Sequence, residues 1–157
     1  MPLILATVFI FLMFMPSYSY AHASWTWIFS SDTCTYYLDK NNVYVDERGI
    51  YYYAIKQDFV DDSARKIHID MLSHLDHDTD FSRFYTEITK YKSCNAIGRP
   101  QIFRQALRMY CYNRDGSFIR NFNGKTNVYR ELKHGGIGEI IDLKARSFAI
   151  YRPSKNS

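Results

Sequence analysis

Glycine and proline are scarce in this chain of 157 residues, which has 7 glycines and 4 prolines. Such low numbers argue against a long low-complexity or disordered tract. Cysteine is scarcer still, and the three positions (Cys34, Cys94 and Cys111) contain no close pair of the kind that a zinc site needs. Charge of one sign never accumulates either: 20 basic and 16 acidic residues are interspersed, with a net charge of +4. A solvated mixed surface is therefore the expectation.

Aromatic residues, by contrast, make up 17% of the chain, with 14 tyrosines and 11 phenylalanines. Tyrosine and phenylalanine favour strands because they fit a pleated, half-buried surface. The length predicts a single domain once a leader is removed.

The first residues predict export. Residues 1–15 are apolar except for Thr7, and Pro16 and Ser17 then break the run. Residues 21–23 (Ala-His-Ala) put small side chains at the two positions that a signal peptidase reads. We predict a signal peptide over residues 1–23, cleaved before Ser24. The alternative is an uncleaved anchor, although about 13 to 15 apolar residues fall short of the ~20 that span a bilayer. No cysteine near this point offers a lipoprotein anchor.

Export also bears on partners. A periplasmic or cell-surface protein is not expected to bind nucleic acid, whereas its mild positive charge suits weak attraction to an anionic envelope surface.

Most of the chain from residue 25 onward predicts strands. Extended, aromatic-rich runs cover residues 25–30, 35–39, 43–45 and 50–59, with polar turns between them. Gly49 is available for a positive φ in the turn before the last of these. In that longest strand one face is apolar and the other polar: Tyr51, Tyr53, Ile55 and Phe59 against Lys56 and Asp58.

The middle of the chain is less regular. Residues 66–71 are predicted to be extended and residues 74–80 to form a surface loop. Residues 81–94 match a helical stripe at Phe81, Phe84, Ile88 and Tyr91, yet strand-forming residues dominate the segment. We favour a strand there and keep the helix as the alternative.

The second half predicts a hairpin and a helix. Residues 101–112 alternate as a strand with Arg104 and Arg108 on one face, and residues 113–116 (Asn-Arg-Asp-Gly) form a hairpin turn to a strand at 117–122. The predicted helix starts after Gly136, with Glu139 in the place of the capping-box acid. Its apolar side can lie on a sheet, and the tail over residues 151–157 is expected to be flexible.

The densest polar cluster raises the question of a metal site. Its members are His68, Asp70, His74, Asp76, His77, Asp78 and Asp80. Histidine with carboxylate suits zinc, and a metal-dependent enzyme would draw its ligands from the core of this group: His74, Asp76, His77 and Asp78. We favour a solvated loop, because alternating charges without a rigid element fix no geometry. No metal and no cofactor is therefore expected.

Other candidate sites have plainer explanations. Exposed tyrosines would suit a sugar or peptide platform, but core and cross-strand packing accounts for most of them. Gly135, Gly136 and Gly138 cap a helix rather than cradle a phosphate, since no Lys-Ser or Lys-Thr follows them. Cys94 lacks the sequence signature of a catalytic nucleophile. We therefore expect a protein that binds rather than an enzyme.

Several motifs recur in an order typical of one known family. They are Trp25 or Trp27 with Ile28; Tyr36-Tyr37-Leu38-Asp39; Val43 and Gly49 before a long strand; Glu87 and Cys94; Arg104; Gly116; and residues 129–139, Tyr-Arg-Glu-Leu-Lys-His-Gly-Gly-Ile-Gly-Glu. Together they resemble the bacterial surface-adhesin protein E-like family over residues 25–144. The last run is similar to the family's aromatic-x-x-I-x-P-G-S-x-G-E segment, with His134-Gly135-Gly136 in place of Pro-Gly-Ser.

The resemblance implies an α+β fold over residues 24–150, namely a curved antiparallel sheet of about six strands with one C-terminal helix on its concave face. It also implies an envelope or surface location and binding to host matrix or plasma proteins. In the family a cysteine late in the helix often tethers it to the strand cysteine, whereas residues 143–146 here are Leu-Lys-Ala-Arg. In its place, a simple up-and-down strand order would bring Cys34 and Cys111 to the same edge. We predict a Cys34–Cys111 disulfide worth ~2–4 kcal/mol, with Cys94 free and buried.

The sequence thus predicts an exported binding module of the adhesin-like kind. Its ligand-binding candidates are Tyr36, Tyr44, Tyr52, Arg104 and Arg108. Its partners would be host matrix or plasma proteins or envelope proteins, and a homodimer is left open. The alternative is a periplasmic structural or assembly component without a host ligand.

Overall fold

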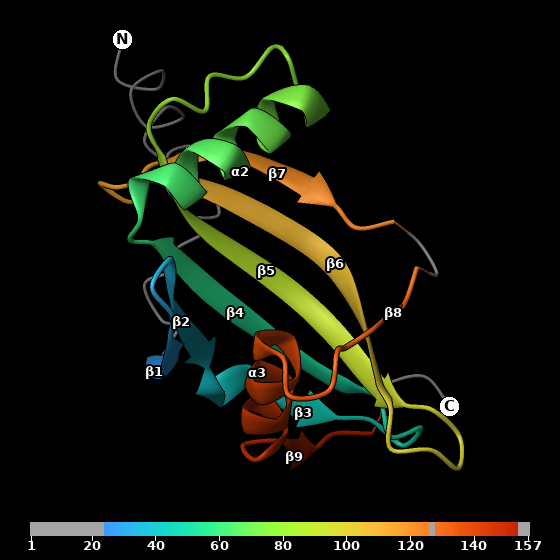
Figure 1. Ribbon diagram of the computed structural model, residues 1–157. Helices are drawn as coiled ribbons and strands as arrows, with labels where there is room; N and C mark the ends of the chain where they lie inside the picture. Colours follow the sequence, from blue (N-terminus) through green and yellow to red (C-terminus); the bar gives the residue numbers. More distant parts are fainter. Residues whose placement is uncertain (1–23, 126–127, 154–157) are drawn as a thin grey trace, which may run out of the picture.

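The computed structural model describes residues 24–125 and 128–153. The predicted signal peptide over residues 1–23 and the tail residues 154–157 lie outside the described residues. The described chain forms one curved, mostly antiparallel sheet with two helices, which is the α+β fold that the sequence predicts (Figure 1).

Six strands form the main path of the sheet, in the order β1-β2-β4-β5-β6-β7. Their bounds are β1 (Trp25–Ser30), β2 (Cys34–Asp39), β4 (Tyr51–Phe59), β5 (Phe84–Asn95), β6 (Ile102–Asn113) and β7 (Phe118–Asn123). Three two-residue strands pair beside this path, namely β3 (Tyr44–Val45), β8 (Arg130–Glu131) and β9 (Ile150–Tyr151), and a 3-10 turn, η2 (Lys40–Asn42), follows β2.

The strand predictions are confirmed for the six main strands and for β3, whereas β8 and β9 were not predicted. β5 settles the ambiguous segment in favour of a strand, because its aromatic and β-branched residues find partners on both β4 and β6. The predicted turns are confirmed by the positive φ angles of Gly49 (73°) and Gly116 (83°).

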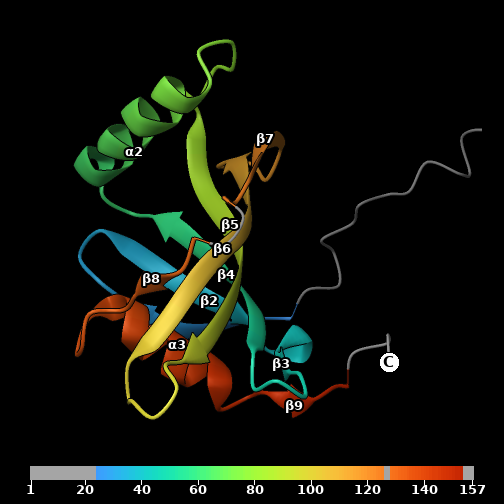
Figure 2. The ribbon, with the colours of Figure 1, turned by 90° about the vertical axis from the view of Figure 1, so that its right-hand side faces the viewer.

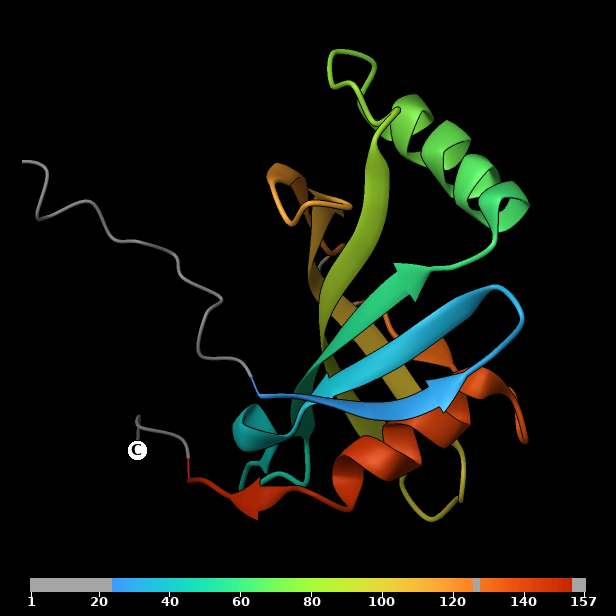
Figure 3. The same ribbon diagram turned by 90° about the vertical axis from the view of Figure 1, so that its left-hand side faces the viewer.

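Both helices, α2 (Asp62–Leu75) and α3 (Ile137–Arg146), lie on the concave face of the sheet (Figures 2 and 3). α3 is the predicted C-terminal helix, with Gly136 at its N-cap. α2 corrects the prediction of an extended segment at residues 66–71. Asp61 caps it by accepting a hydrogen bond from the Ala64 amide at 2.7 Å, and Ile69 and Leu72 turn toward the sheet.

The apolar core is divided between the two helices. One cluster lies under α2 and consists of Cys34, Phe59, Leu72, Phe81, Phe84 and Cys111. The other lies under α3 and consists of Leu38, Val43, Tyr53, Ile55, Ile141 and Ala145. Each helix therefore stabilises its own end of the sheet.

The C-terminal residues are more ordered than predicted. Tyr151, expected to begin a flexible tail, forms β9 with Ile150 and pairs in parallel with β3. The Arg152 amide extends this pairing by donating to the Val45 carbonyl at 2.9 Å.

Candidate functional site

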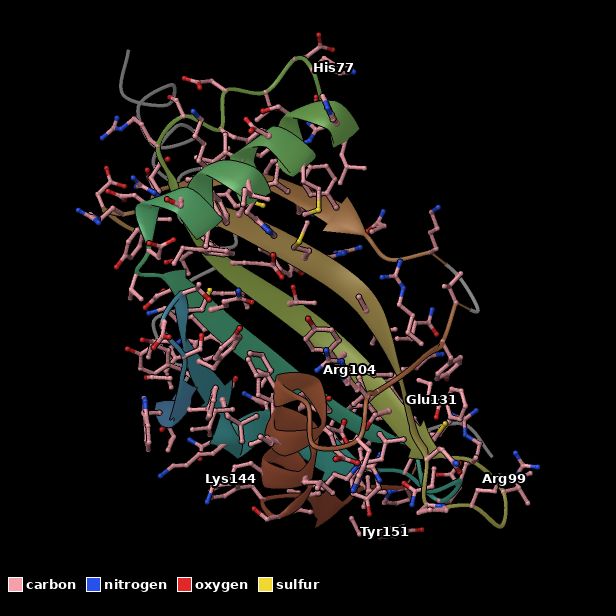
Figure 4. All side chains as sticks on the ribbon, in the orientation of Figure 1. His77, Arg99, Arg104, Glu131, Lys144 and Tyr151 are labelled. Carbon is pink, nitrogen blue, oxygen red and sulfur yellow. The ribbon has the colours of Figure 1, made fainter. Side chains whose placement is uncertain are left out.

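A cavity of about 580 Å³ opens on the concave face, in the part of the sheet between α2 and α3. Its volume falls in the range of small-ligand pockets. It is lined by Leu75 from α2; Glu87, Thr89 and Tyr91 from β5; Arg104, Ala106 and Met109 from β6; Phe122 and Asn123 from β7; and Gly124, Lys125, Val128, Arg130, Glu131 and Leu132 from the connection to α3. Figure 4 shows Arg104 and Glu131 near the start of α3.

The floor of the cavity is a polar row along β5. Glu87, Thr89 and Tyr91 line the cavity, and Ser93 continues the row toward α3; all four side chains share the concave face because alternate residues of a strand point the same way. Glu87, Thr89 and Ser93 are buried. The Thr89 hydroxyl donates a short hydrogen bond to Glu87 Oε1. The row joins the two apolar clusters across the middle of the sheet.

α2 closes one end of the row with His68. Its Nε2 lies 3.0 Å from Glu87 Oε2, at ion-pair distance although not at the angle of a hydrogen bond. The imidazole packs against the rings of Phe59 and Phe84, with centroid distances of 4.7 and 5.2 Å. Both Glu87 oxygens therefore already have protein neighbours, so this carboxylate shapes the floor rather than offering a vacant ligand position.

α3 closes the other end through a buried ion pair. Asp142, which is 0% exposed, accepts a hydrogen bond from the Tyr53 hydroxyl at 2.5 Å and lies 2.5 Å from Arg146 Nε. Arg146 also donates to Ser93 Oγ at 3.1 Å and to Asn95 Oδ1. This network ties α3 to β4 and β5.

Arg104 connects this network to the cavity. Its guanidinium lies over the Tyr91 ring, 4.3 Å from the centroid. Burial acts to lower the Arg104 pKa, but the neighbouring Tyr91 and Tyr53 oxygens outweigh it and raise the pKa. Burial, reinforced by the Glu87 carboxylate, raises the pKa of Tyr91 to about 12. At neutral pH the wall therefore offers hydrogen-bond donors from a charged guanidinium and a protonated phenol.

The five predicted binding residues separate in the structure. Arg104 alone lines the cavity. Tyr36 packs against both apolar clusters, and burial, with Cys34 nearby, raises its pKa to about 12. Tyr44 and Tyr52 stack on each other on the opposite face, with ring centroids 4.8 Å apart. Arg108 also lies on that face.

The separation of Arg104 from Arg108 corrects the predicted alternation in β6. The register shifts between Lys90 and Tyr91, where Lys90 pairs with Arg108 but Tyr91 pairs with Ala106. Leu107 is thus the extra residue of a β-bulge, which reverses the alternation between the two arginines. The Gly124 amide donates to the Leu107 carbonyl at 2.9 Å and holds the bulge in place.

The predicted disulfide is wrong, since all three cysteines are free. Strands β4 and β5 separate Cys34 on β2 from Cys111 on β6, so the two lie three strand spacings apart, roughly 14 Å along the sheet. A disulfide requires Cα atoms within about 7 Å. Burial, reinforced by Glu87, raises the pKa of Cys111 to about 12, which makes it an inert core thiol. Cys94 is half-buried rather than buried.

The His/Asp cluster is dispersed by α2. Asp76 is held by Thr79 at 2.8 Å and by Arg120 at 2.9 Å, while the His74 and His77 rings stand 6.3 Å apart. Residues 24–125 and 128–153 contain no group of three or more histidine, cysteine or acidic side chains placed to hold a metal ion.

Sequence reasoning named Glu87 and His68 separately but missed the polar row. The alternation of Glu87, Thr89, Tyr91 and Ser93 was the available signal, yet an all-polar face gives no hint that it is the buried one. In the described part of the chain, no helix has the length and apolar character needed to cross a membrane. Comparison with family models, with curated proteins and with solved structures returned no match for this chain, so the resemblance to the adhesin family stays a prediction.

Proposed function

We propose that this chain is an exported binding protein that receives a segment of a partner polypeptide in the concave cavity. The observation that carries this proposal is the cavity itself, which combines a polar floor on a rigid sheet with an exposed apolar rim.

The apolar rim favours a polypeptide partner. Leu75, 62% exposed, and Val128, 43% exposed, both line the cavity. Ile67 and Met71 continue the line of Leu75 along α2 at a spacing of four residues, and both are exposed. A partner covering this stripe would bury apolar surface at about 25 cal/mol per Å².

The polar wall would supply selectivity. Arg104 stacks one face of its guanidinium on Tyr91 and neighbours the Tyr53 hydroxyl, and it lines the cavity with a group that carries five N–H donors. A carboxylate or backbone carbonyl of the partner fits the remaining donors.

Export and partner class rest on the sequence. The apolar start, the small residues before Ser24 and the family resemblance all support a surface or periplasmic protein that binds host matrix, plasma or envelope proteins. Intact-mass analysis of the secreted chain tests the export step. A chain beginning at Met1 would contradict it.

A plate assay with immobilised vitronectin, laminin and plasminogen tests binding. The decisive variant is Ala106→Phe, because Ala106 is exposed on the cavity floor and a ring there fills the cavity without removing any core side chain. Asn121→Phe, at an exposed position of β7, is the matched control. We expect Ala106→Phe alone to lose binding. Equal binding by both variants would refute the cavity as the site, and no binding by the unchanged chain would remove these three partners.

A further inference from the structure

Neither α2 nor α3 covers the convex face of the sheet, since both lie on the other side (Figures 2 and 3). Strand alternation assigns its side chains. Lys56 from β4, Lys90 and Lys92 from β5, and Arg108 from β6 all point to this face.

These cations are packed more closely than stability alone would favour. Lys90 is the direct cross-strand partner of Arg108, and Lys92 follows Lys90 on the same face of β5. Like charges directly opposite each other destabilise a sheet. No carboxylate in the described residues forms an ion pair with Lys90, Lys92 or Arg108.

Three carboxylates on or beside this face already have partners: Asp58 with Lys56 at 3.1 Å, Asp46 with Arg48 at 2.7 Å, and buried Asp39 with Asn42 at 2.7 Å. Lys90, Lys92 and Arg108 therefore keep positive charges that no ion pair among the described residues neutralises.

Tyrosines hold the three lysines in place. The ammonium groups of Lys56, Lys90 and Lys92 lie 4.9, 5.7 and 5.1 Å from the ring centroids of Tyr37, Tyr110 and Tyr129 respectively. Cation–π contacts of this kind reduce the freedom of a flexible side chain. They also cover the ring faces, so a ligand approaching the centre of this surface meets charge and not bare aromatic platforms.

We propose that the convex face binds a linear acidic polysaccharide across β4, β5 and β6. A flexible polyanion can follow the curved sheet and reach Lys90, Lys92 and Arg108 together, whereas a flat anionic bilayer touches only its crest. A single-stranded nucleic acid would need free ring faces for its bases to stack on. Trp27, 60% exposed, lies across from Tyr37 on β1 and gives a sugar ring an apolar surface at one end of the row.

The test uses polygalacturonate as the probe and neutral dextran as the matched polymer, with binding measured by calorimetry at low salt. We expect the unchanged chain to bind polygalacturonate, to lose affinity as salt is raised, and to ignore dextran. The variant Lys90→Gln/Lys92→Gln/Arg108→Gln should lose roughly tenfold or more in affinity. The charge-matched control Lys66→Gln/Arg99→Gln/Lys133→Gln, at three exposed positions away from this face, should bind like the unchanged chain.

A second readout separates binding from folding. Arg108→Gln alone removes the like-charge pair with Lys90, so it should leave the thermal midpoint unchanged or higher while weakening polygalacturonate binding. The proposal is overturned by no binding at low salt, by equal losses in the two triple variants, or by tighter binding of anionic vesicles or oligothymidylate than of polygalacturonate.

Discussion

The buried ion pair of α3 allows the sharpest stability prediction. Asp142→Asn keeps the size of the side chain and an acceptor for the Tyr53 hydroxyl, but it removes the charge that faces Arg146 at 2.5 Å. Removing one partner of a buried pair costs about 3–5 kcal/mol, because the other charge stays buried and uncompensated. Because Arg146 keeps its hydrogen bonds to Ser93 and Asn95, we expect the free energy of unfolding to fall by an amount at the lower end of this range, about 3 kcal/mol. That is a large part of the ~5–15 kcal/mol by which a domain is stable.

The chain offers a matched control on its other helix. Asp62 pairs with Arg65 at 2.7 Å on α2, but the Asp62 side chain is 84% exposed. Asp62→Asn should therefore cost no more than about 0.5 kcal/mol. Urea unfolding of both variants, followed by far-UV circular dichroism, measures the difference.

A double variant tests whether the stability lost in Asp142→Asn comes from the uncompensated charge of Arg146. Asp142→Asn with Arg146→Met removes both charges and should recover part of the stability that Asp142→Asn loses. A cost of less than about 1 kcal/mol for Asp142→Asn, or a cost no greater than that of Asp62→Asn, would contradict the role of the buried Asp142–Arg146 pair in anchoring α3.

Three further predictions concern the bulge, the buried phenol and the thiols. Gly124→Ala should destabilise the protein by about 3 kcal/mol or more, because a methyl group there overlaps the Ala106 carbonyl; urea unfolding measures this, and a loss under about 1 kcal/mol would contradict it. Tyr91 contributes stability that is complete below pH 10 and lost toward pH 12, since its folded pKa of about 12 exceeds the ordinary value of 10.0. Unfolding free energies across this range should fall more steeply for the unchanged chain than for Tyr91→Phe; parallel curves would be inconsistent with the raised pKa. Thiol titration in denaturant without reductant should find three free thiols per chain, and a count of one would restore a disulfide.

The strands were predictable because their information is local. Alternation and aromatic content place the six main strands, and Asn-Arg-Asp-Gly places the hairpin after β6. α2 was not found because Ile67, Ile69 and Met71 alternate as in a strand. Only Leu72 of this helix is fully buried, which blurs its 3.6-residue pattern. Asp61 at the N-cap was the signal that could have found it.

The site depends on contacts between residues that are far apart in the sequence, and local sequence patterns do not encode such contacts. The faces of Arg104 and Arg108 are set by a bulge that Gly124 holds from the far end of the next strand. The cysteine pairing failed for the same kind of reason: sheet order, which places β4 and β5 between β2 and β6, is a property of the whole fold.

The methionines give the most direct test of the concave site. After cleavage before Ser24 the chain would keep only Met71, on the exposed rim of α2, and Met109, on the cavity floor. A methyl-labelled sample of residues 24–157 should therefore show two methionine signals in a proton–carbon correlation spectrum. Titration with peptide fragments of a partner found in the plate assay should shift both signals with one shared Kd. A peptide that binds while leaving both methyl signals unmoved would contradict the cavity as the binding site.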